Sequence, residues 1–268
     1  DAAMRRYFAE TQQPVVPVEC ESFEQVVHAV TEGRADYAAM AIENTIAGPL
    51  LPNNELLRTN AVHIVGEHKM RISHALLALP GDRLEDITEV RSHPMAIMQC
   101  DRFLKAHPQW RVTEAFDTAG AARALCEERP DDRCLAAISP AGAASTYGLQ
   151  VLADGIETNK HNYTRFLILV PGAEAEAAAD ADKASIVFSL PHTEGSLSKV
   201  LTVLALYDMN MTRIQSMPVI GREWEYRFYI DLTFNDIQRS RQALDAARPL
   251  MSDLKVLGFY KDAPTPVL

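Results

Sequence analysis

Three short segments of the chain combine polar side chains that can donate hydrogen bonds or bind anions. They are Ile42-Glu43-Asn44-Thr45-Ile46-Ala47-Gly48, Ser92-His93-Pro94 and Asn162-Tyr163-Thr164-Arg165-Phe166. Amide, hydroxyl and imidazole groups can orient a substrate or pass it a proton, and a guanidinium binds carboxylates. Each segment also has a purely structural interpretation, as a strand-to-helix turn, a helix cap and a strand entry with an exposed arginine. On the residues alone, both interpretations stay open.

Motifs of metal, serine-hydrolase and nucleotide chemistry are missing from the sequence. Cys20, Cys100, Cys126 and Cys134 show no CxxC spacing, and none of the eight histidines lies in a His-Glu-x-x-His arrangement. The sequence also has no Gly-x-Ser-x-Gly elbow and no P-loop. We therefore expect reduced, mostly buried thiols, no metal and no cofactor.

Alternating strands and helices must position the three polar segments. Ser22-Phe23-Glu24-Gln25 is a capping box that predicts a helix ending at Gly33, and residues 37–42 read as a buried strand. Three more strand-to-helix steps, each opened by a capping residue or a proline, are expected at residues 89–94, 110–118 and 134–140. This pattern predicts an α/β fold, in which helix N-termini gather at the carboxyl ends of parallel strands and can bind anions.

A change of composition marks a linker at residues 173–183, where aromatic and branched side chains are absent. The pattern beyond it predicts a small ferredoxin-like unit of order β-α-β-β-α-β. Its expected elements are residues 184–190, 196–207, 211–220, 224–232, 236–250 and 254–260. A unit of this kind suits dimerisation or effector binding.

Taken in order, the polar motifs resemble those of the prephenate dehydratase family over nearly the whole chain. The matching stretches are the Ile-Glu-Asn-Thr loop with Gly48, Ser92-His93-Pro94 followed by Gln99-Cys100, Asp117-Thr118-Ala119 with Ala121-Ala122, Tyr147-Gly148-Leu149 and Asn162-Tyr163-Thr164-Arg165-Phe166. The C-terminal unit is similar to the ACT domain of these enzymes, in Gly195-Ser196-Leu197 and in residues 210–218.

This resemblance implies a fold and a division into domains. Residues 1–172 are expected to form a catalytic domain with two lobes, like a type II periplasmic binding protein, whose second lobe covers about residues 77–155. Residues 184–268 are expected to form the ACT regulatory domain.

The resemblance also implies an activity, the conversion of prephenate to phenylpyruvate, water and carbon dioxide on the route to phenylalanine. Prephenate is a small dianion, and its aromatisation expels a hydroxyl group and a carboxylate without a redox or metal cofactor. Hydroxide is a poor leaving group, so a donor must assist its departure. In the family, the threonine of the Thr-Arg-Phe motif is tied to activity, which makes Thr164 the expected donor, ahead of Glu43 and His93.

Further site residues follow from the same resemblance. Arg165 is expected to bind a substrate carboxylate through a bidentate contact, and Asn44 and Thr45 are expected to orient the ring hydroxyl. Asp117 is expected to cap a helix. The other expected substrate contacts are Ser92, His93, Thr118, Ala119, Asn162 and Phe166.

An ACT domain implies feedback by L-phenylalanine and assembly through that domain, as a homodimer or a dimer of dimers. The expected effector-binding residues are Gly195, Ser196, Leu197, Asn210, Gln215 and Ser216. The Glu-Ser-Arg-Pro of the family is Gln215-Ser216-Met217-Pro218 here, which removes two charges near that site. The sequence begins at Asp1-Ala2-Ala3, past the Gly-rich loop that opens the family's catalytic domain, and shows no chorismate mutase segment, so we expect a monofunctional enzyme.

Composition restricts the partners and the location. Lys and Arg number 26 against 36 Asp and Glu, a formal net charge of -10, so the surface repels nucleic acid phosphates. No apolar run approaches the roughly 20 residues that span a bilayer, and the first residues do not resemble a signal peptide. We expect a cytoplasmic protein that binds neither nucleic acid nor membranes.

Two other functions remain open. An arogenate dehydratase would act on a substrate with an amino group in place of the keto group of prephenate. A non-catalytic solute-binding protein could use the same two-lobed fold, because its helix N-termini also bind anions.

Overall fold

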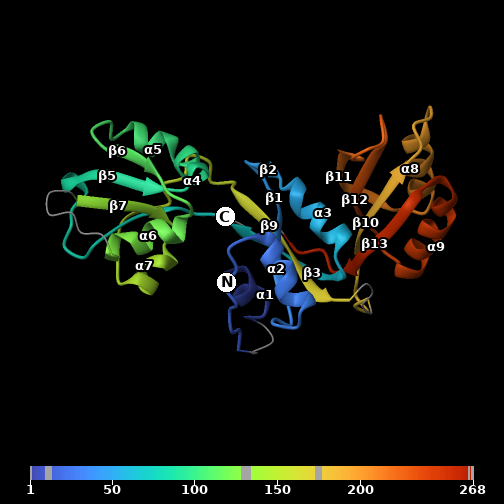
Figure 1. Ribbon diagram of the computed structural model, residues 1–268, viewed down its shortest axis with the longest axis horizontal. Coiled ribbons are helices and arrows are strands. Elements are labelled where there is room, and N and C mark those ends of the chain that lie inside the picture. Colours follow the sequence, from blue (N-terminus) through green and yellow to red (C-terminus); the bar gives the residue numbers. More distant parts are fainter. Residues whose placement is uncertain (1, 10–13, 128–133, 173–176, 265, 267–268) are drawn as a thin grey trace. The chain divides into compact units, whose positions relative to one another are not determined.

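The structure is a computed structural model that describes residues 2–9, 14–127, 134–172, 177–264 and 266 (Figure 1). Its contacts group the chain into two compact units. Among the described residues, the first unit lies within 1–44, 48–70 and 164–266, and the second lies within 45–47 and 71–163. The C-terminal β-α-β-β-α-β segment therefore belongs to the same unit as the first strands of the chain.

The N-terminal part of the first unit is a four-stranded sheet of order β2-β1-β9-β3 with three helices. The strands are β1 (Ala38–Asn44), β2 (Gly48–Pro49), β3 (Val62–Arg71) and β9 (Tyr163–Pro171), and the helices are α1 (Ala2–Tyr7), α2 (Phe23–Thr31) and α3 (Leu51–Thr59). The predicted cap of α2 is confirmed, because Ser22 Oγ accepts a 3.2 Å hydrogen bond from the Gln25 amide. The helix ends before Gly33, which adopts a φ of 72°.

Two of the polar segments meet at paired strands. Residues 45–47 form a turn, and the segment of Thr164 lies at the start of β9, as the structural interpretations predict. The differences are that β2 follows the turn before any helix, and that Arg165 is buried. Glu43 and Asn44 are the last residues of β1, and Thr164 and Arg165 lie near the start of β9. The two strands pair antiparallel, with Glu43 opposite Arg165 and Asn44 opposite Thr164. Because successive side chains of a strand point to opposite faces, Thr164 and Arg165 must face different surroundings.

The C-terminal part of the first unit is a four-stranded antiparallel sheet of order β11-β12-β10-β13. Its elements follow the predicted order: β10 (Lys183–Leu190), α8 (Ser196–Leu206), β11 (Asn210–Pro218), β12 (Tyr226–Thr233), α9 (Ile237–Ala247), the 3₁₀ turn η3 (Arg248–Leu250) and β13 (Ser252–Tyr260). We call it the C-terminal sheet. Figure 1 shows α8 and α9 on one side of it and α3 on the other.

The C-terminal sheet is buried on both faces. One face packs under α8 and α9 through residues such as Ile186, Phe188 and Leu204. The other face contributes Val187 and Tyr229 to the core that β1, β3 and β9 share with α2 and α3. The two sheets of the first unit therefore have a common hydrophobic core.

The predicted linker differs from the structure at its end. Residues 173–176 lie outside the described residues, whereas Lys183 is the first residue of β10 and is buried. A lysine is rarely buried without a partner. Here the ammonium of Lys183 lies 3.0 Å from Glu67 and 2.8 Å from Asp262, so the linker prediction is wrong for Lys183.

The second unit is a five-stranded sheet of order β6-β5-β7-β4-β8 in which β5 runs parallel to β6 and β7. Its elements are β4 (Ala75–Ala78), the 3₁₀ turn η2 (Leu84–Asp86), β5 (Ile87–Ser92), α4 (Pro94–Gln99), α5 (Asp101–Lys105), β6 (Arg111–Glu114), α6 (Thr118–Glu127), β7 (Cys134–Ser139), α7 (Gly142–Tyr147) and β8 (Gln150–Asp154). The three predicted strand-to-helix steps are confirmed, because α4, α6 and α7 follow β5, β6 and β7. No helix in the described part of the chain has the length and apolar character needed to cross a membrane.

Candidate active site

The polar pair of Asn44 and Thr164 joins two strands of the first unit. Asn44 Nδ2 donates a hydrogen bond of 3.0 Å to Thr164 Oγ1. The two residues are only 8% and 9% exposed. Since the hydroxyl oxygen already accepts from Asn44 and no described residue takes the Thr164 hydrogen, that hydrogen is available for donation.

The neighbouring side chain of Arg165 points to the other face of β9 and is already paired. Its Nε lies 2.6 Å from Glu67 Oε2, its Nη1 binds the Asp231 carboxylate, and its Nη2 donates to the Tyr260 hydroxyl at 2.9 Å. Arg165 is nearly buried. In this structure protein acceptors occupy its guanidinium, and the contact with a substrate carboxylate stays a prediction.

Thr45 has a structural role in the second unit. Its hydroxyl donates to the His161 carbonyl at 3.0 Å and accepts from the Tyr163 amide at 2.9 Å. The Thr45 amide also donates to the Tyr163 carbonyl. The single hydrogen of this hydroxyl is therefore used by the backbone, and the role of Thr45 in orienting the substrate's ring hydroxyl stays a prediction.

The polar side chains at the end of β5 also form hydrogen bonds with the backbone. Ser92 is 0% exposed, and its hydroxyl donates a 2.6 Å hydrogen bond to the Ile138 carbonyl of the neighbouring strand. His93 caps α4, since its Nδ1 accepts from the Met95 amide at 3.1 Å. The structural alternative for this segment is thus the one observed. The Ser92 side chain is completely buried, and its contact with substrate stays a prediction.

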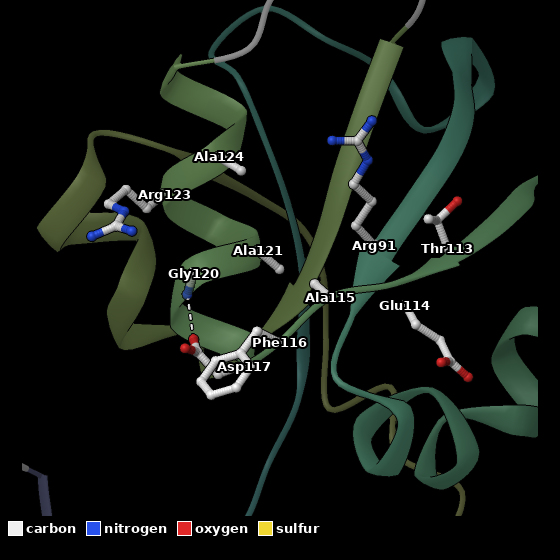
Figure 2. Close-up of a pocket in the computed structure, with 10 residues that line it drawn as sticks. All are labelled: Arg91, Thr113, Glu114, Ala115, Phe116, Asp117, Gly120, Ala121, Arg123 and Ala124. Carbon is white, nitrogen blue, oxygen red and sulfur yellow. Dashed lines mark hydrogen bonds between the residues drawn. The ribbon is translucent and has the colours of Figure 1, made fainter. Parts of the chain in front are cut away.

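The candidate residues at the start of α6, Thr118 and Ala119, are at least partly exposed to solvent. Thr118 is half-buried and Ala119 is exposed in the first turn of this helix. Asp117 accepts a hydrogen bond from the Gly120 amide, so its predicted capping role is confirmed (Figure 2). Amides in the first turn of a helix attract anions, which keeps this end of α6 a candidate for a carboxylate.

A pocket of about 350 Å³ lies next to this helix start (Figure 2). Its lining comes from β5, β6, the turn after β6 and α6: Arg91, Thr113, Glu114, Ala115, Phe116, Asp117, Gly120, Ala121, Arg123 and Ala124. The Arg91 guanidinium pairs with Glu89 at 2.7 Å. None of the residues predicted to contact substrate is among those that line this pocket.

The last two predicted substrate contacts flank Thr164. Asn162 is completely buried, and its carbonyl accepts a hydrogen bond of 2.7 Å from the Ile72 amide. Its contact with substrate stays a prediction. Phe166 is half-buried opposite Ala41 in the β1–β9 pair, two residues from Thr164 and so on the same face of the strand.

The strand pairing of the C-terminal sheet places the predicted effector residues at two opposite ends of that sheet. Asn210 pairs with Thr233, which pairs with Lys183 at the start of β10. Gly195 follows the other end of β10 and precedes α8. Gly195 and Asn210 of one chain thus lie at opposite ends of the C-terminal sheet, about 25 Å apart at 3.3 Å per residue. Ser196, Leu197, Gln215 and Ser216 belong to the Gly195 end.

Sequence reasoning missed the acidic partners of Arg165. Glu67 on β3 and Asp231 on β12 are both buried, and the Lys183 ammonium and the Ala263 amide also bind Glu67. In the sequence, Asp231 alternates with the apolar residues Phe228, Ile230 and Leu232 of its strand. Such alternation is the usual pattern of a strand with one solvent-exposed face, so it gave no signal of a buried ion pair.

The cysteines differ in part from the prediction. All four thiols are free, but only Cys100 is buried, and Cys126 is exposed. Burial raises the pKa of Cys100 to about 12, so this thiol is unreactive at neutral pH. Within the described residues, no three His, Cys, Asp or Glu side chains form a group that could hold a metal ion.

Comparison with known proteins finds a family model and relatives that are similar to this chain. The family model described as prephenate dehydratase matches residues 1–174. The chain is 37% identical over 267 residues to arogenate dehydratase 5 of Arabidopsis thaliana, a match that covers 93% of this chain and 62% of that protein. The chain therefore spans less than two thirds of the length of this relative.

Solved structures share the fold. A prephenate dehydratase from Arthrobacter aurescens in complex with L-Phe has a TM-score of 0.83 and 29% identity, over 96% of this chain and 87% of that one. A protein described as GqqA, a quorum quenching acylase, has a TM-score of 0.86 and 31% identity, over 98% and 94% of the two chains. Both similarities include the C-terminal sheet.

Proposed function

Since the chain belongs to the prephenate dehydratase family, we propose that it is a lyase that converts prephenate to phenylpyruvate, water and carbon dioxide. The observation that carries this proposal is the Thr164 hydroxyl, whose oxygen accepts from Asn44 while its hydrogen stays available. A donor of this kind is what the reaction needs, because hydroxide leaves slowly without one.

Thr164 assists a reaction in which two bonds break. The bond from the ring to the carboxylate breaks and releases carbon dioxide, and its electron pair moves into the ring. The bond from the ring to the hydroxyl oxygen breaks at the opposite carbon of the ring, and the ring becomes aromatic. Thr164 donates a hydrogen bond to the departing oxygen, which leaves as water after it gains a proton. Asn44 keeps the Thr164 hydroxyl oriented for this donation.

A dianionic substrate needs partners other than Arg165, whose guanidinium is occupied. In the proposed function, the first-turn amides of α6 at Thr118 and Ala119 bind a carboxylate, with the help of the positive end of the helix dipole. The position of Phe166, on the same face of β9 as Thr164, supports an apolar contact with the substrate ring. We propose that the protein is located in the cytoplasm.

Arogenate is the alternative substrate, which the 37% identity to a plant arogenate dehydratase supports. The two substrates differ only by an amino group in place of a keto group, so kcat/KM for each measures the preference directly. Purified protein is assayed for phenylpyruvate, by its absorbance in alkali, and for phenylalanine from arogenate. Turnover of neither substrate, together with tight binding of prephenate in calorimetry, would instead favour a non-catalytic binding protein.

The likeness to an acylase calls for a third assay. Hydrolysis of an acylated amine is followed in the same preparation by release of the free amine. Turnover of prephenate with no release of amine supports the proposed lyase. Release of amine without formation of phenylpyruvate would contradict it.

The proposal includes L-phenylalanine as an inhibitory effector at an ACT-type C-terminal sheet, as the Arthrobacter structure holds L-Phe. Because Gly195 and Asn210 lie at opposite ends of that sheet, one chain does not bring both to one small ligand. The proposed effector site therefore combines Gly195 of one copy with Asn210 of another. Light scattering with and without phenylalanine tests for the dimer, and Asn210→Ala is expected to weaken phenylalanine binding without changing kcat.

A further inference from the structure

A second cross-strand pair lies directly beside Asn44 and Thr164. Glu43 is opposite Arg165 in the register of β1 and β9. Strand alternation turns these two side chains away from the donor pair, toward the C-terminal sheet. A register shift between Ala41 and Glu43 marks a bulge at this point of β1. Bulges next to active sites re-aim the side chains that follow them.

Residues of the C-terminal sheet hold both members of this pair. Asp231 on β12 binds Arg165 through its carboxylate, which also lies 3.8 Å from the Nη1 of Arg213 on β11. The Nε of Arg213 lies 3.6 Å from Glu43. The result is a continuous line of alternating charges, Glu43, Arg213, Asp231 and Arg165, which we call the charge chain.

The middle of the charge chain is buried and hydrogen-bonded. Asp231 is 3% exposed, and its second carboxylate oxygen accepts from the Ser185 hydroxyl at 2.6 Å. Burial alone would raise the pKa of Asp231, but Arg165 and Arg213 outweigh it and keep that pKa below its usual value. The Arg213 side chain is 7% exposed and donates to Asn54 Oδ1 at 3.1 Å. Asp231 is therefore ionised at neutral pH.

Packing of the two sheets does not by itself require this arrangement. The Tyr229 hydroxyl, two residues from Asp231 on β12, donates to Glu55 and so joins the C-terminal sheet to α3 without contact to residue 43 or 165. Buried ion pairs seldom stabilise a fold more than apolar residues of the same volume would. The charge chain differs from the Tyr229 contact in one respect, since its ends lie next to the two residues of the donor pair.

We propose that Asp231 and Arg213 are positioning residues, which act through Arg165 and Glu43 to set the geometry of Asn44 and Thr164. The inference rests on the proposed function, because it assigns these residues to the same dehydration step. Asp231 is one of the three acceptors of the Arg165 guanidinium, beside Glu67 and Tyr260, so its displacement lets the guanidinium shift without freeing it. A shift of Arg165 is passed to Thr164, the preceding residue of β9. The 3.0 Å contact between Asn44 and Thr164 is the part of the site that such a shift changes.

This route predicts a specific kinetic signature. The donor pair assists the departing oxygen in the transition state and contributes little to ground-state binding, so a misplaced pair lowers kcat and leaves KM nearly unchanged. Small misplacements of reacting groups cost up to about 100-fold in rate. A residue with a merely structural role would lower the melting temperature without this split between kcat and KM.

The experiment compares Asp231→Asn, which keeps the shape and removes the charge, with Tyr229→Phe, which breaks a neighbouring contact between the C-terminal sheet and α3. Wild type and variants are assayed for kcat and KM with prephenate and for melting temperature. We expect Asp231→Asn to lower kcat about 10- to 100-fold with KM within about twofold. Tyr229→Phe is expected to lower the melting temperature and to keep the wild-type kcat. Arg213→Lys keeps the charge, loses the fork and is expected to show a smaller loss of kcat.

A double-mutant cycle tests whether Asp231 acts through Thr164. In the Thr164→Val background, Asp231→Asn is expected to lower the remaining kcat less than twofold, because the donor that it positions is already gone. A full, additive loss in that background would overturn the inference, as would wild-type kcat in both Asp231→Asn and Arg213→Lys. If Asp231→Asn fails to fold, the kcat of Arg213→Lys tests the inference in its place. An inactive wild type would instead contradict the proposed function, which is a separate outcome.

Discussion

The side-chain amide of Asn44 donates to the hydroxyl oxygen of Thr164, and the direction of this hydrogen bond decides what Thr164 can do. A threonine hydroxyl has one hydrogen, and a neighbour that accepted it would leave nothing for a substrate. An amide donor occupies a lone pair of the oxygen and leaves the hydrogen free. Asn44 thus prepares Thr164 as a donor and has no need to contact the substrate itself.

Thr164→Val removes the hydroxyl at nearly constant volume. We expect kcat for prephenate to fall about 10²- to 10⁴-fold, which is the usual contribution of a proton or hydrogen-bond donor. Thr164→Ser keeps the hydroxyl and is expected to retain most of the activity, apart from a loss through its freer rotamers. Steady-state kinetics at neutral pH measures both variants. Equal activity of wild type and Thr164→Val would remove Thr164 from the mechanism.

Asn44→Asp tests the direction of the hydrogen bond. An ionised carboxylate can only accept, so it would take the Thr164 hydrogen and lower kcat further than Asn44→Ala, which leaves that hydrogen free. Protonation of the new carboxyl at low pH would restore a donor and narrow the gap between the two variants. The measurement is the ratio of their kcat values between pH 4 and pH 8. A ratio independent of pH would contradict this orientation of Thr164.

The order of strands and helices was predictable because its signals are local. Ser22 and Asp236 accept from amides within three residues along the chain, so a cap can be recognised in a few letters of sequence. The ends of β1 and β9 carry no such signal. Asn44 and Thr164 look like loop residues, and they become strand residues only through pairing with partners 120 positions away.

The candidate site was predictable in its residue types and less so in its contacts. Nothing local distinguishes the hydroxyl of Thr164, which is available, from those of Ser92 and Thr45, which donate to backbone carbonyls. The protein acceptors of Arg165 were not predictable, because Asp231 lies 66 residues further along the chain in another sheet. The three-dimensional pairing of strands is what separates these cases.

The pH dependence of stability is expected to include Glu55. The Arg58 hydrogen bond is the largest influence on Glu55, burial opposes it and the Tyr229 hydroxyl adds to it, and the pKa of Glu55 falls from 4.5 to about 2. A carboxyl with a lowered pKa in the folded state stabilises the protein above its unfolded pKa and loses this contribution as the pH falls through the folded pKa. The stabilisation by Glu55 is therefore complete above pH 4.5 and is lost between pH 4.5 and about 2.

Comparison of wild type with Glu55→Gln checks this window. The Glu55 side chain is 34% exposed, so solvent screening limits the expected difference to about 1 kcal/mol at neutral pH. Urea unfolding from pH 2 to pH 7 gives the free energy of unfolding of both proteins. The difference should shrink as the pH falls below 4.5 and vanish near pH 2. A constant difference across the range would show that Glu55 acts through its shape and not through its charge.

Gly258 marks the closest approach of the C-terminal sheet to the first sheet. A Cβ atom at this position of β13 would lie 2.2 Å from the carbonyl oxygen of Ile64 and 2.8 Å from its Cβ atom on β3. Gly258→Ala must therefore push the two strands apart, and we expect a loss of about 1–3 kcal/mol in the free energy of unfolding.

Gly142→Ala is the matched control for Gly258→Ala. A Cβ atom at Gly142 would meet nothing within 4 Å, so an alanine there is expected to leave stability unchanged or slightly raised. Denaturant unfolding of both variants separates steric contact from the general effect of losing a glycine. Because Ile64 and Gly258 lie in the region where the two sheets of the first unit meet, Gly258→Ala should also lower kcat if that packing supports the donor pair. Wild-type stability in Gly258→Ala would show that β3 and β13 are not packed this closely.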